Sequence, residues 1–312
     1  MVYKLRSKVR KLRQESFFDT GDYRQTVILA GAGRSGTTWL QETINCQNDF
    51  RIMFEPFHSK KIPLLNHWNY RQYLRNDNRN DRFLVPATRI LKGRVRHKWI
   101  DKYNQKVYSR KRLIKDIRIQ LLLHWIKHNF PEIPIILLLR HPCAVANSKL
   151  KLGWDSHLDD FLMQDELVTD FLSPFQKELE NAKDPFDKHI FMWCVENYIP
   201  LKQFNKHEIL VVFYEHLCTG PEQQVERVMP FIGSTFSSDM LDKILKPSAQ
   251  SRKDSAIVSG VDLVSSWRAS VSDERVKRAI DILKIFGLQD VYNEGDMPLL
   301  DGTKALDVFS AQ

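Results

Sequence analysis

The chain has 312 residues, of which 43% are hydrophobic and 11% aromatic, and such values are typical of a folded globular protein with a substantial core. They exclude a disordered chain, and no apolar run approaches the roughly 18 residues that a transmembrane helix requires. The net charge is +9, but residues 71–118 alone carry 16 Lys and Arg against 4 Asp and Glu, so the remainder is slightly acidic.

The cysteines and the N-terminal residues indicate the cellular compartment in which the protein is expected. The four cysteines are scattered without a Cys-x-x-Cys pair, which favours neither a zinc site nor a disulfide framework. The N-terminus lacks the apolar core of a signal peptide, so we expect a cytoplasmic protein. Residues 1–13 combine six basic residues with apolar residues at helical spacing. Weak contact with an anionic membrane surface and an ordinary leading helix are both compatible with that pattern.

Short apolar runs alternate with helical patterns along the chain. The predicted strands are residues 26–30, 50–54, 112–115, 135–139 and 209–213. The predicted helices are residues 37–46, 119–130, a helix that Pro142 opens, residues 221–231, and a last helix that Ser272 caps. This alternation predicts an α/β fold with a parallel sheet flanked by helices. Residues 59–108 are expected to cap the sheet, and the acidic residues 154–187 to form an exposed helical section.

A glycine-rich loop between the first strand and the first helix is the strongest motif. The spacing from Gly31 to Gly36 fits a P-loop, whose backbone N–H groups bind phosphate at a helix N-terminus. The lysine expected after the second glycine is replaced by Thr37, and a cation stands instead within the loop, as Arg34. ATP hydrolysis is disfavoured because that lysine normally reaches the β- and γ-phosphates.

Polar residues follow the other predicted strands where each strand ends. They are Glu55, the pair Lys115-Asp116, Arg140 and Tyr214. Because the carboxyl ends of parallel strands meet at one edge of a sheet, and ligands bind there, these side chains should lie around one site. Ser148 follows Arg140 by eight residues, two turns into the next helix.

These segments resemble the sulfotransferase family. Residues 34–39, Arg-Ser-Gly-Thr-Thr-Trp, resemble the loop that binds the 5′-phosphosulfate of 3′-phosphoadenosine 5′-phosphosulfate (PAPS), and Arg140 with Ser148 resembles the 3′-phosphate motif. Residues 213–217 and the pair Trp267-Arg268 are similar to two further family segments. The resemblance implies a P-loop-type parallel sheet in a single domain with capping insertions. We expect a basic segment over residues 1–24, the domain over 25–290 and a C-terminal tail over 291–312.

The loop cation and the second strand end indicate a branch of the family. Phenol- and steroid-sulfating members carry a loop lysine and a catalytic histidine after the third strand, where this chain has Lys115-Asp116. Arg34 and Glu55-Pro56 are closer to the carbohydrate and tyrosylprotein enzymes and their bacterial relatives.

The resemblance implies roles for individual residues. Glu55 would be the general base, and Arg34 would act with it on the transferred group. The residues implied in nucleotide binding are Gly33, Arg34, Ser35, Gly36, Thr37, Thr38, Trp39, Arg140, Ser148, Tyr214, Arg252 and Trp267. For Tyr214 and Trp267, packing in the core is an equal alternative. His58 and His141 are competing bases with structural alternatives, and no metal is expected because arginines and N–H groups neutralise the charge.

The function expected is sulfuryl transfer from PAPS to an acceptor hydroxyl on a carbohydrate. A lipid, a small alcohol or a peptide tyrosine remains open as acceptor. Two other classes are a P-loop nucleoside or metabolite kinase, which the missing lysine disfavours, and a basic nucleic-acid-binding module. The module would explain the charge of residues 71–118 but not the Arg140 and Ser148 pair.

Overall fold

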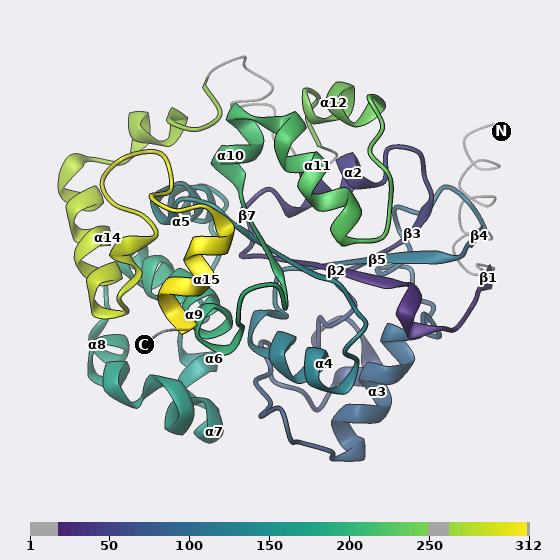
Figure 1. Cartoon of the computed structure of the whole chain (residues 1–312). Coiled ribbons are helices and arrows are strands. Elements are labelled where there is room, and N and C mark those ends of the chain that lie inside the picture. The colour runs from purple at the N-terminus through teal and green to yellow at the C-terminus, as the bar shows by residue number, and fades with distance from the viewer. Residues whose placement is uncertain (1–17, 249–261, 311–312) are drawn as a thin grey trace, which may run out of the picture.

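Parallel strands run through the centre of the computed structural model, which describes residues 18–248 and 262–310 (Figure 1). Five strands pair in the order β3-β5-β2-β6-β7. Their bounds are Thr26–Ala30 for β2, Phe50–Phe54 for β3, Lys111–Asp116 for β5, Ile135–Leu139 for β6 and Leu210–Phe213 for β7. Every neighbouring pair is parallel, so all five carboxyl ends lie at one edge, as predicted.

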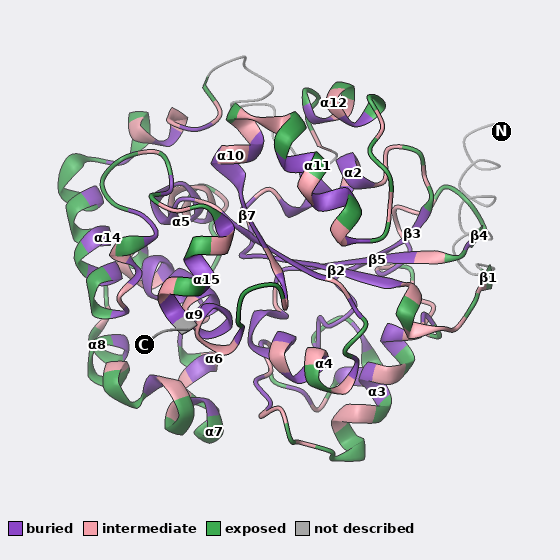
Figure 2. Ribbon diagram, viewed as in Figure 1, coloured by how far each residue is buried: buried purple, intermediate pink, exposed green. Residues whose placement is uncertain are grey.

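Helices cover both faces of this sheet (Figure 1). Successive strand residues point alternately to the two faces. On one face, Val27 and Leu29 pack with α2 (Thr37–Ile44), α10 (Tyr214–Thr219), α11 (Pro221–Phe231) and α12 (Asp239–Ile244). On the other face, Ile28 and Ala30 belong to a larger core. Its helices include α3 (Asp81–Leu91), α4 (Leu123–Asn129), α5 (Pro142–Leu150), α9 (Pro185–Gln203), α14 (Asp273–Ile285) and α15 (Gly302–Ser310). Because both faces are covered, the strands are buried (Figure 2), and β2 and β6 are apolar along nearly their whole length.

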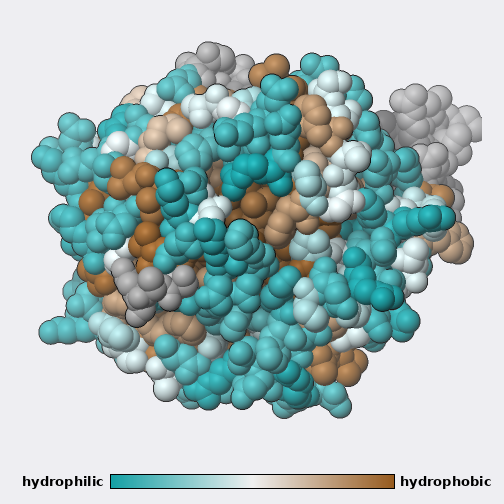
Figure 3. Space-filling model, in the orientation of Figure 1, coloured by the Kyte–Doolittle hydropathy of each residue, from teal (hydrophilic) through white to brown (hydrophobic). Residues whose placement is uncertain are grey.

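Shorter elements complete the described residues. They are β1 (Phe18–Asp19), β4 (Tyr108–Ser109), α6 (Asp159–Leu162), α7 (Asp165–Leu167), α8 (Gln176–Asn181) and several single helical turns. On the face drawn in Figure 3, hydrophilic side chains cover most of the surface and apolar ones are scattered among them. No helix in the described ranges is long and apolar enough to cross a lipid bilayer.

The structure confirms the predicted strands to within one residue at either end, and it confirms α2, α11 and the Ser272 cap of α14. The predicted helix over residues 119–130 divides into a 3₁₀ turn, Gln120–Leu122, and α4. The acidic section is helical, but the prediction that it is exposed is wrong for its apolar side chains. These pack in the larger core: Phe161, Leu167, Leu172 and Leu179.

Several helices were not predicted, and the largest of them are α9 and α15. The 19-residue α9 is buried on nearly every side and therefore has no amphipathic pattern. Within residues 291–312, expected to form a tail, α15 packs on α9 and β7, and its side chains Ala305, Leu306 and Phe309 are buried.

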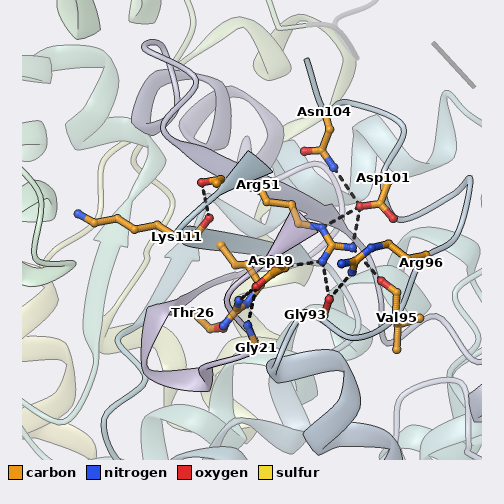
Figure 4. A network of polar contacts seen from close by, with 12 residues as sticks. Asp19, Gly21, Thr26, Arg51, Gly93, Val95, Arg96, Asp101, Asn104 and Lys111 are labelled. Carbon is orange, nitrogen blue, oxygen red and sulfur yellow. Dashed lines mark hydrogen bonds and ion pairs between the residues drawn. The ribbon is translucent and has the colours of Figure 1, made fainter. Parts of the chain in front are cut away.

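Two buried arginines near the amino ends of the strands hold the first described residues against the sheet (Figure 4). Arg51 of β3 and Arg112 of β5 are adjacent in register, and both side chains are fully buried. Asp19 lies between them, with Oδ2 at 3.0 Å from Arg51 Nη1 and Oδ1 paired with Arg112 Nη1. Asp101 accepts from Arg51 Nη2 at 2.8 Å. Gly93 must be glycine here, because its φ is +63° and a Cβ would collide with the Asp19 carboxylate.

We predict that Asp19→Ala strongly destabilises the fold, because it leaves Arg112 without its carboxylate partner and Arg51 with only one. Removing one member of a buried ion pair costs about 3–5 kcal/mol, measurable as a lower free energy of unfolding in urea. The matched control is Asp49→Ala, whose pair with Lys106 is exposed and 3.9 Å long. The control should lose about 1 kcal/mol or less, and equal losses in the two variants would contradict the interpretation.

Candidate functional site

The carboxyl ends of the strands carry the predicted polar residues. In sheet order they are Glu55 after β3, Asp116 at the end of β5, the glycine loop after β2, Arg140 after β6 and Tyr214 after β7. Neighbouring strands lie about 4.8 Å apart, so these groups form one row across the edge. The structure thus brings together residues separated by as much as 180 positions in the sequence, from Arg34 to Tyr214.

The glycine loop passes too close to its neighbours for larger residues. A Cβ on Gly31 would lie 2.5 Å from the Leu138 carbonyl oxygen, and one on Gly36 would lie 2.7 Å from the Tyr214 ring. Gly36, with φ of +95°, is the N-cap of α2, and Arg34 also has a left-handed φ of +77°. The hydroxyl of Ser35 donates to the Ala32 carbonyl at 2.6 Å and so fixes the turn itself. The loop therefore presents backbone N–H groups and the start of α2, where Thr37 and Thr38 are buried, to a common point.

Arg34, Arg140 and Ser148 meet beside this loop. Arg34 Nε donates to the Ser148 hydroxyl at 3.0 Å, and Arg140 Nη1 donates to the Arg34 carbonyl at 3.1 Å. The Arg140 guanidinium lies over the Tyr214 ring, 4.1 Å from its centroid. Tyr214 in turn packs against Trp39, whose indole N–H donates to the Ile244 carbonyl at 2.9 Å. Two guanidinium groups and a hydroxyl are thus arranged where a phosphate-bearing ligand would be bound.

The backbone on either side of Arg140 is held by buried groups. Its carbonyl accepts from the Trp193 indole of α9 at 3.0 Å, and the following amide, of His141, donates to Glu215 at 2.8 Å. The other Glu215 oxygen accepts from the Tyr292 hydroxyl at 2.8 Å. These contacts fix where Arg140 leaves the strand, and sequence reasoning did not single out Trp193 or Tyr292 for this role.

Glu55 is held by two cations. Its Oε1 accepts from Lys115 Nζ at 2.9 Å and its Oε2 from Arg118 Nη1 at 2.8 Å, and its side chain is 6% exposed. Burial raises the pKa of Glu55, but the Lys115 and Arg118 charges outweigh it and bring that pKa below its ordinary value. Glu55 is therefore a carboxylate at neutral pH. Its φ of +45° is strained for a residue with a side chain, as is often found at functional positions.

The turn after β5 joins Glu55 to the glycine loop. Asp116 accepts from the amides of Phe57 and Arg118, both at 2.9 Å, and so ties the turn that follows Glu55 to the turn that carries Arg118. Burial first, and then the Glu55 charge, raise the pKa of Asp116 to about 6. Ile117 touches the loop, because a Cβ on Gly33 would lie 3.2 Å from its Cδ1 and 2.9 Å from Trp154. Arg118 lies three residues beyond the predicted strand 112–115, and this was the signal that could have found it.

The remaining predicted residues are buried next to the site or lie outside the described ranges. Trp267 is buried and stacks on His141, with ring centroids 4.5 Å apart. Burial lowers the pKa of His141 to about 3 and that of His58 to about 4, so both rings are neutral at pH 7. Arg252 lies outside the described residues. In the part of the chain that the structure describes, no group of three or more His, Cys, Asp or Glu side chains could hold a metal ion.

The burial of His141 predicts how stability depends on pH. Its pKa is about 3 in the folded state and about 6.5 in the unfolded state, so only the unfolded chain binds this proton between those values. The stabilisation is complete above pH 6.5 and is lost as the pH falls, by about 2 kcal/mol between pH 6.5 and 5. Urea unfolding should show this loss for the native chain and a smaller loss for His141→Gln. The exposed His128→Gln should keep the native pH dependence, and the same dependence in His141→Gln would refute the prediction.

With this geometry established, comparison with known proteins is informative. The family model described as "Sulfotransferase domain" matches residues 24–275, and no curated protein sequence matches the chain. Solved structures with a similar chain path include mouse sulfotransferase SULT7A1 complexed with PAP, at 14% identity and a TM-score of 0.45, with 95% of this chain and 92% of that one covered. Another is sulfotransferase STF9 from Mycobacterium avium, at 11% identity, a TM-score of 0.47, and coverage of 88% and 78%.

A third is retinol dehydratase in complex with androsterone and inactive cofactor PAP, at 18% identity, a TM-score of 0.42, and coverage of 84% and 80%. These likenesses are too distant to carry an argument about ligands. The domain match covers most of the chain, and it agrees with the parallel sheet and the loop described above. The chain therefore belongs to the sulfotransferase family and is an enzyme of that family, as the sequence motifs predicted.

Proposed function

We propose that this chain transfers the sulfuryl group of PAPS to an acceptor hydroxyl. The observation that carries the proposal is the meeting of Arg34, Arg140 and Ser148 beside the glycine loop. Membership of the sulfotransferase family supports sulfuryl transfer over the phosphoryl transfer of a P-loop kinase. PAPS, when bound, supplies the sulfuryl group and a phosphorylated adenosine that leaves.

Two sets of residues would bind the two ends of the nucleotide. Backbone N–H groups of residues 33–38, with the Arg34 side chain, would bind the 5′-phosphosulfate at the start of α2. Arg140 and the Ser148 hydroxyl would bind the 3′-phosphate, and the Tyr214 ring, which packs against the Arg140 guanidinium, would hold that group in position. The loop is shaped by its glycines and by the buried residues beside them: Gly33, Gly36, Ser35, Thr37, Thr38 and Trp39. The absence of side chains at the glycines supports a close approach of the backbone to a phosphate group.

The nucleotide proposal predicts a thermal shift with 3′-phosphoadenosine 5′-phosphate (PAP) larger than that with ATP or duplex DNA. Arg140→Ala should weaken PAP binding about 10- to 100-fold, because it removes charged hydrogen bonds worth about 1.5–3 kcal/mol. The same substitution should weaken binding of AMP, which lacks the 3′-phosphate, much less. The control is Arg110→Ala, an exposed arginine near the amino end of β5, which should bind PAP normally. Equal losses for PAP and AMP in Arg140→Ala would refute the 3′-phosphate assignment.

We also propose Glu55 as the general base. A sulfuryl group transferred in line through a loose transition state requires mainly positioning and charge stabilisation from the protein. Glu55 is ionised, is held at the edge beside the loop, and is linked to that loop through Arg118 and Ile117. Because its pKa is low, it would accept the hydroxyl proton only as the new S–O bond forms. Lys115 and Arg118 would keep its oxygens oriented.

Glu55→Gln tests the base. We expect kcat for sulfuryl transfer to fall by about 100-fold or more while the dissociation constant of PAP stays unchanged, since the amide cannot accept the proton. The exposed Glu178→Gln serves as the matched control and should keep full activity. Near-native turnover by Glu55→Gln with normal PAP binding would disprove the assignment.

A carbohydrate hydroxyl is the acceptor that we propose. Partly exposed aromatic side chains of the segment 57–103 lie against the neighbours of Glu55: Trp99 and Tyr103 against Phe54, and Tyr70 against Arg118. Such rings suit the apolar faces of sugars, whose hydroxyl groups lie at the edges. A panel of glycans, a lipid alcohol, a small alcohol and a tyrosine peptide, assayed with labelled PAPS, would decide among the acceptor classes.

A cytoplasmic location belongs to the same proposal. It is supported by the four cysteines, which are free thiols in the structure, as a reducing compartment allows. Contact of residues 1–13 with an anionic membrane stays a prediction, because those residues lie outside the described ranges.

A further inference from the structure

We propose that the acceptor carries an anionic group close to the hydroxyl that is sulfated, and that Lys60, Arg71 and Arg118, gathered around Tyr70, bind this group. The inference rests on the proposed function, since it concerns the acceptor of that same site. The anion we argue for is the carboxylate of an acidic oligosaccharide. We call Lys60, Tyr70, Arg71 and Arg118 the Tyr70 cluster.

The Tyr70 ring collects cations from three parts of the chain. Lys60 Nζ lies 4.3 Å from the ring centroid, and the guanidinium carbons of Arg118 and Arg71 lie 4.8 Å and 5.0 Å from it. The rings of His58 and His157 pack against Tyr70 edge to face at 5.2 Å and 5.0 Å. An aromatic face stabilises nearby cations, so Tyr70 offsets part of the repulsion among them. The result is a preformed group of positive charges.

The carboxylates around the cluster are each shared by two cations. Glu55 pairs with Arg118 and with Lys115. Glu196 of α9 accepts from Arg71 Nε at 2.7 Å and lies 3.7 Å from Lys149 Nζ. The group of Arg71, Lys149 and Glu196 therefore keeps one excess positive charge, since Lys149, whose pKa burial lowers to about 8, is still protonated at pH 7. In the group of Glu55, Lys115 and Arg118 the neighbouring Asp116, whose pKa is about 6, is ionised at pH 7 and offsets the excess.

Lys60 adds a further positive charge on this side, and two aspartates lie near His157. The exposed Lys60 has no carboxylate within 4.0 Å among the residues that the structure describes. The two histidines are neutral at pH 7, because burial above all lowers the pKa of each. Asp155 and Asp160 lie 4.0 Å and 3.8 Å from His157, and Asp155 is mostly exposed.

Two donors of the cluster lack partners, which points to a ligand. Arg71 Nη1 and Arg118 Nε are buried and make no hydrogen bond to any described residue. Arg71 is only 5% exposed, and its other bond goes to Glu196. A buried guanidinium N–H without an acceptor costs free energy, and an anionic oxygen would remove that cost.

The cluster is separated from the proposed nucleotide residues. Arg34, Arg140 and Tyr214 stand at the ends of β2, β6 and β7, whereas Glu55 and Arg118 follow β3 and β5 at the other side of the sheet. Arg118 touches both Glu55, at 2.8 Å, and Tyr70. An anion on the cluster would therefore lie next to the hydroxyl that faces Glu55, on the same sugar unit or an adjacent one. The nucleotide's own phosphates would be bound elsewhere.

The experiment compares two probes on the full chain saturated with PAP. One is a uronate-containing oligosaccharide, and the other is the same oligosaccharide with each carboxylate reduced to a primary alcohol. Calorimetry should show binding of the acidic probe at least about tenfold tighter than of the reduced probe. Lys60→Gln should weaken binding of the acidic probe about three- to tenfold and leave the affinities for the reduced probe and for PAP unchanged. Lys106→Gln, a matched lysine that pairs with Asp49 near the start of β3, should change neither.

Equal affinity for the two probes, or binding of neither, would overturn the anionic acceptor, and so would equal effects of Lys60→Gln on both. Lys60 is exposed, so its variant should fold, and unchanged PAP binding verifies this. If the native chain does not bind PAP, or transfers no sulfuryl group to any acceptor of the panel, the proposed function itself is contradicted. The two failures are therefore distinguishable.

Discussion

The parallel hydrogen bonding of β2, β3, β5, β6 and β7 decides where every side chain of the site lies. One register places Glu55, Asp116, the glycine loop, Arg140 and Tyr214 in a row, because each follows a strand that ends at the same edge. The loop depends on this register most closely, since Gly31 lies against the Leu138 carbonyl of β6 and Gly36 against the ring that follows β7. A shift of one residue between neighbouring strands would remove both contacts.

Charge is distributed between the two ends of the same strands, with different consequences. At the amino ends, Arg51 and Arg112 are buried with Asp19 and Asp101 and hold the chain together (Figure 4). At the carboxyl ends, the cations face a site: Lys115 and Arg118 hold one carboxylate, and Arg34 and Arg140 gather beside the loop. The basic stretch 71–118 thus contributes to stability and to the site, and this accounts for part of its charge without a nucleic acid.

Much of the fold could be predicted because most of its strands contain short apolar runs and several of its helices begin at recognisable residues such as Pro142, Pro221 and Ser272. Helix α9 could not, because burial on nearly all sides leaves no periodic pattern. Its Trp193 and Glu196 nevertheless touch Arg140 and Arg71, so the helix that was missed supports both halves of the site. Trp267 shows the opposite case, since it matches a family motif yet stacks on His141 in the core.

The sequence alone determined the α/β class, the glycine-rich loop with its internal Arg34, the pair of Arg140 and Ser148, and the family, because each depends on residues adjacent or regularly spaced along the chain. Only the tertiary structure decided which side chains contact one another in the site. That Glu55 is held by Lys115 and Arg118, and that Tyr70 gathers Lys60, Arg71 and Arg118, depends on how segments far apart in the chain pack together. Burial then set the protonation of these groups, because a pKa follows from the surroundings of a side chain and not from its neighbours in sequence.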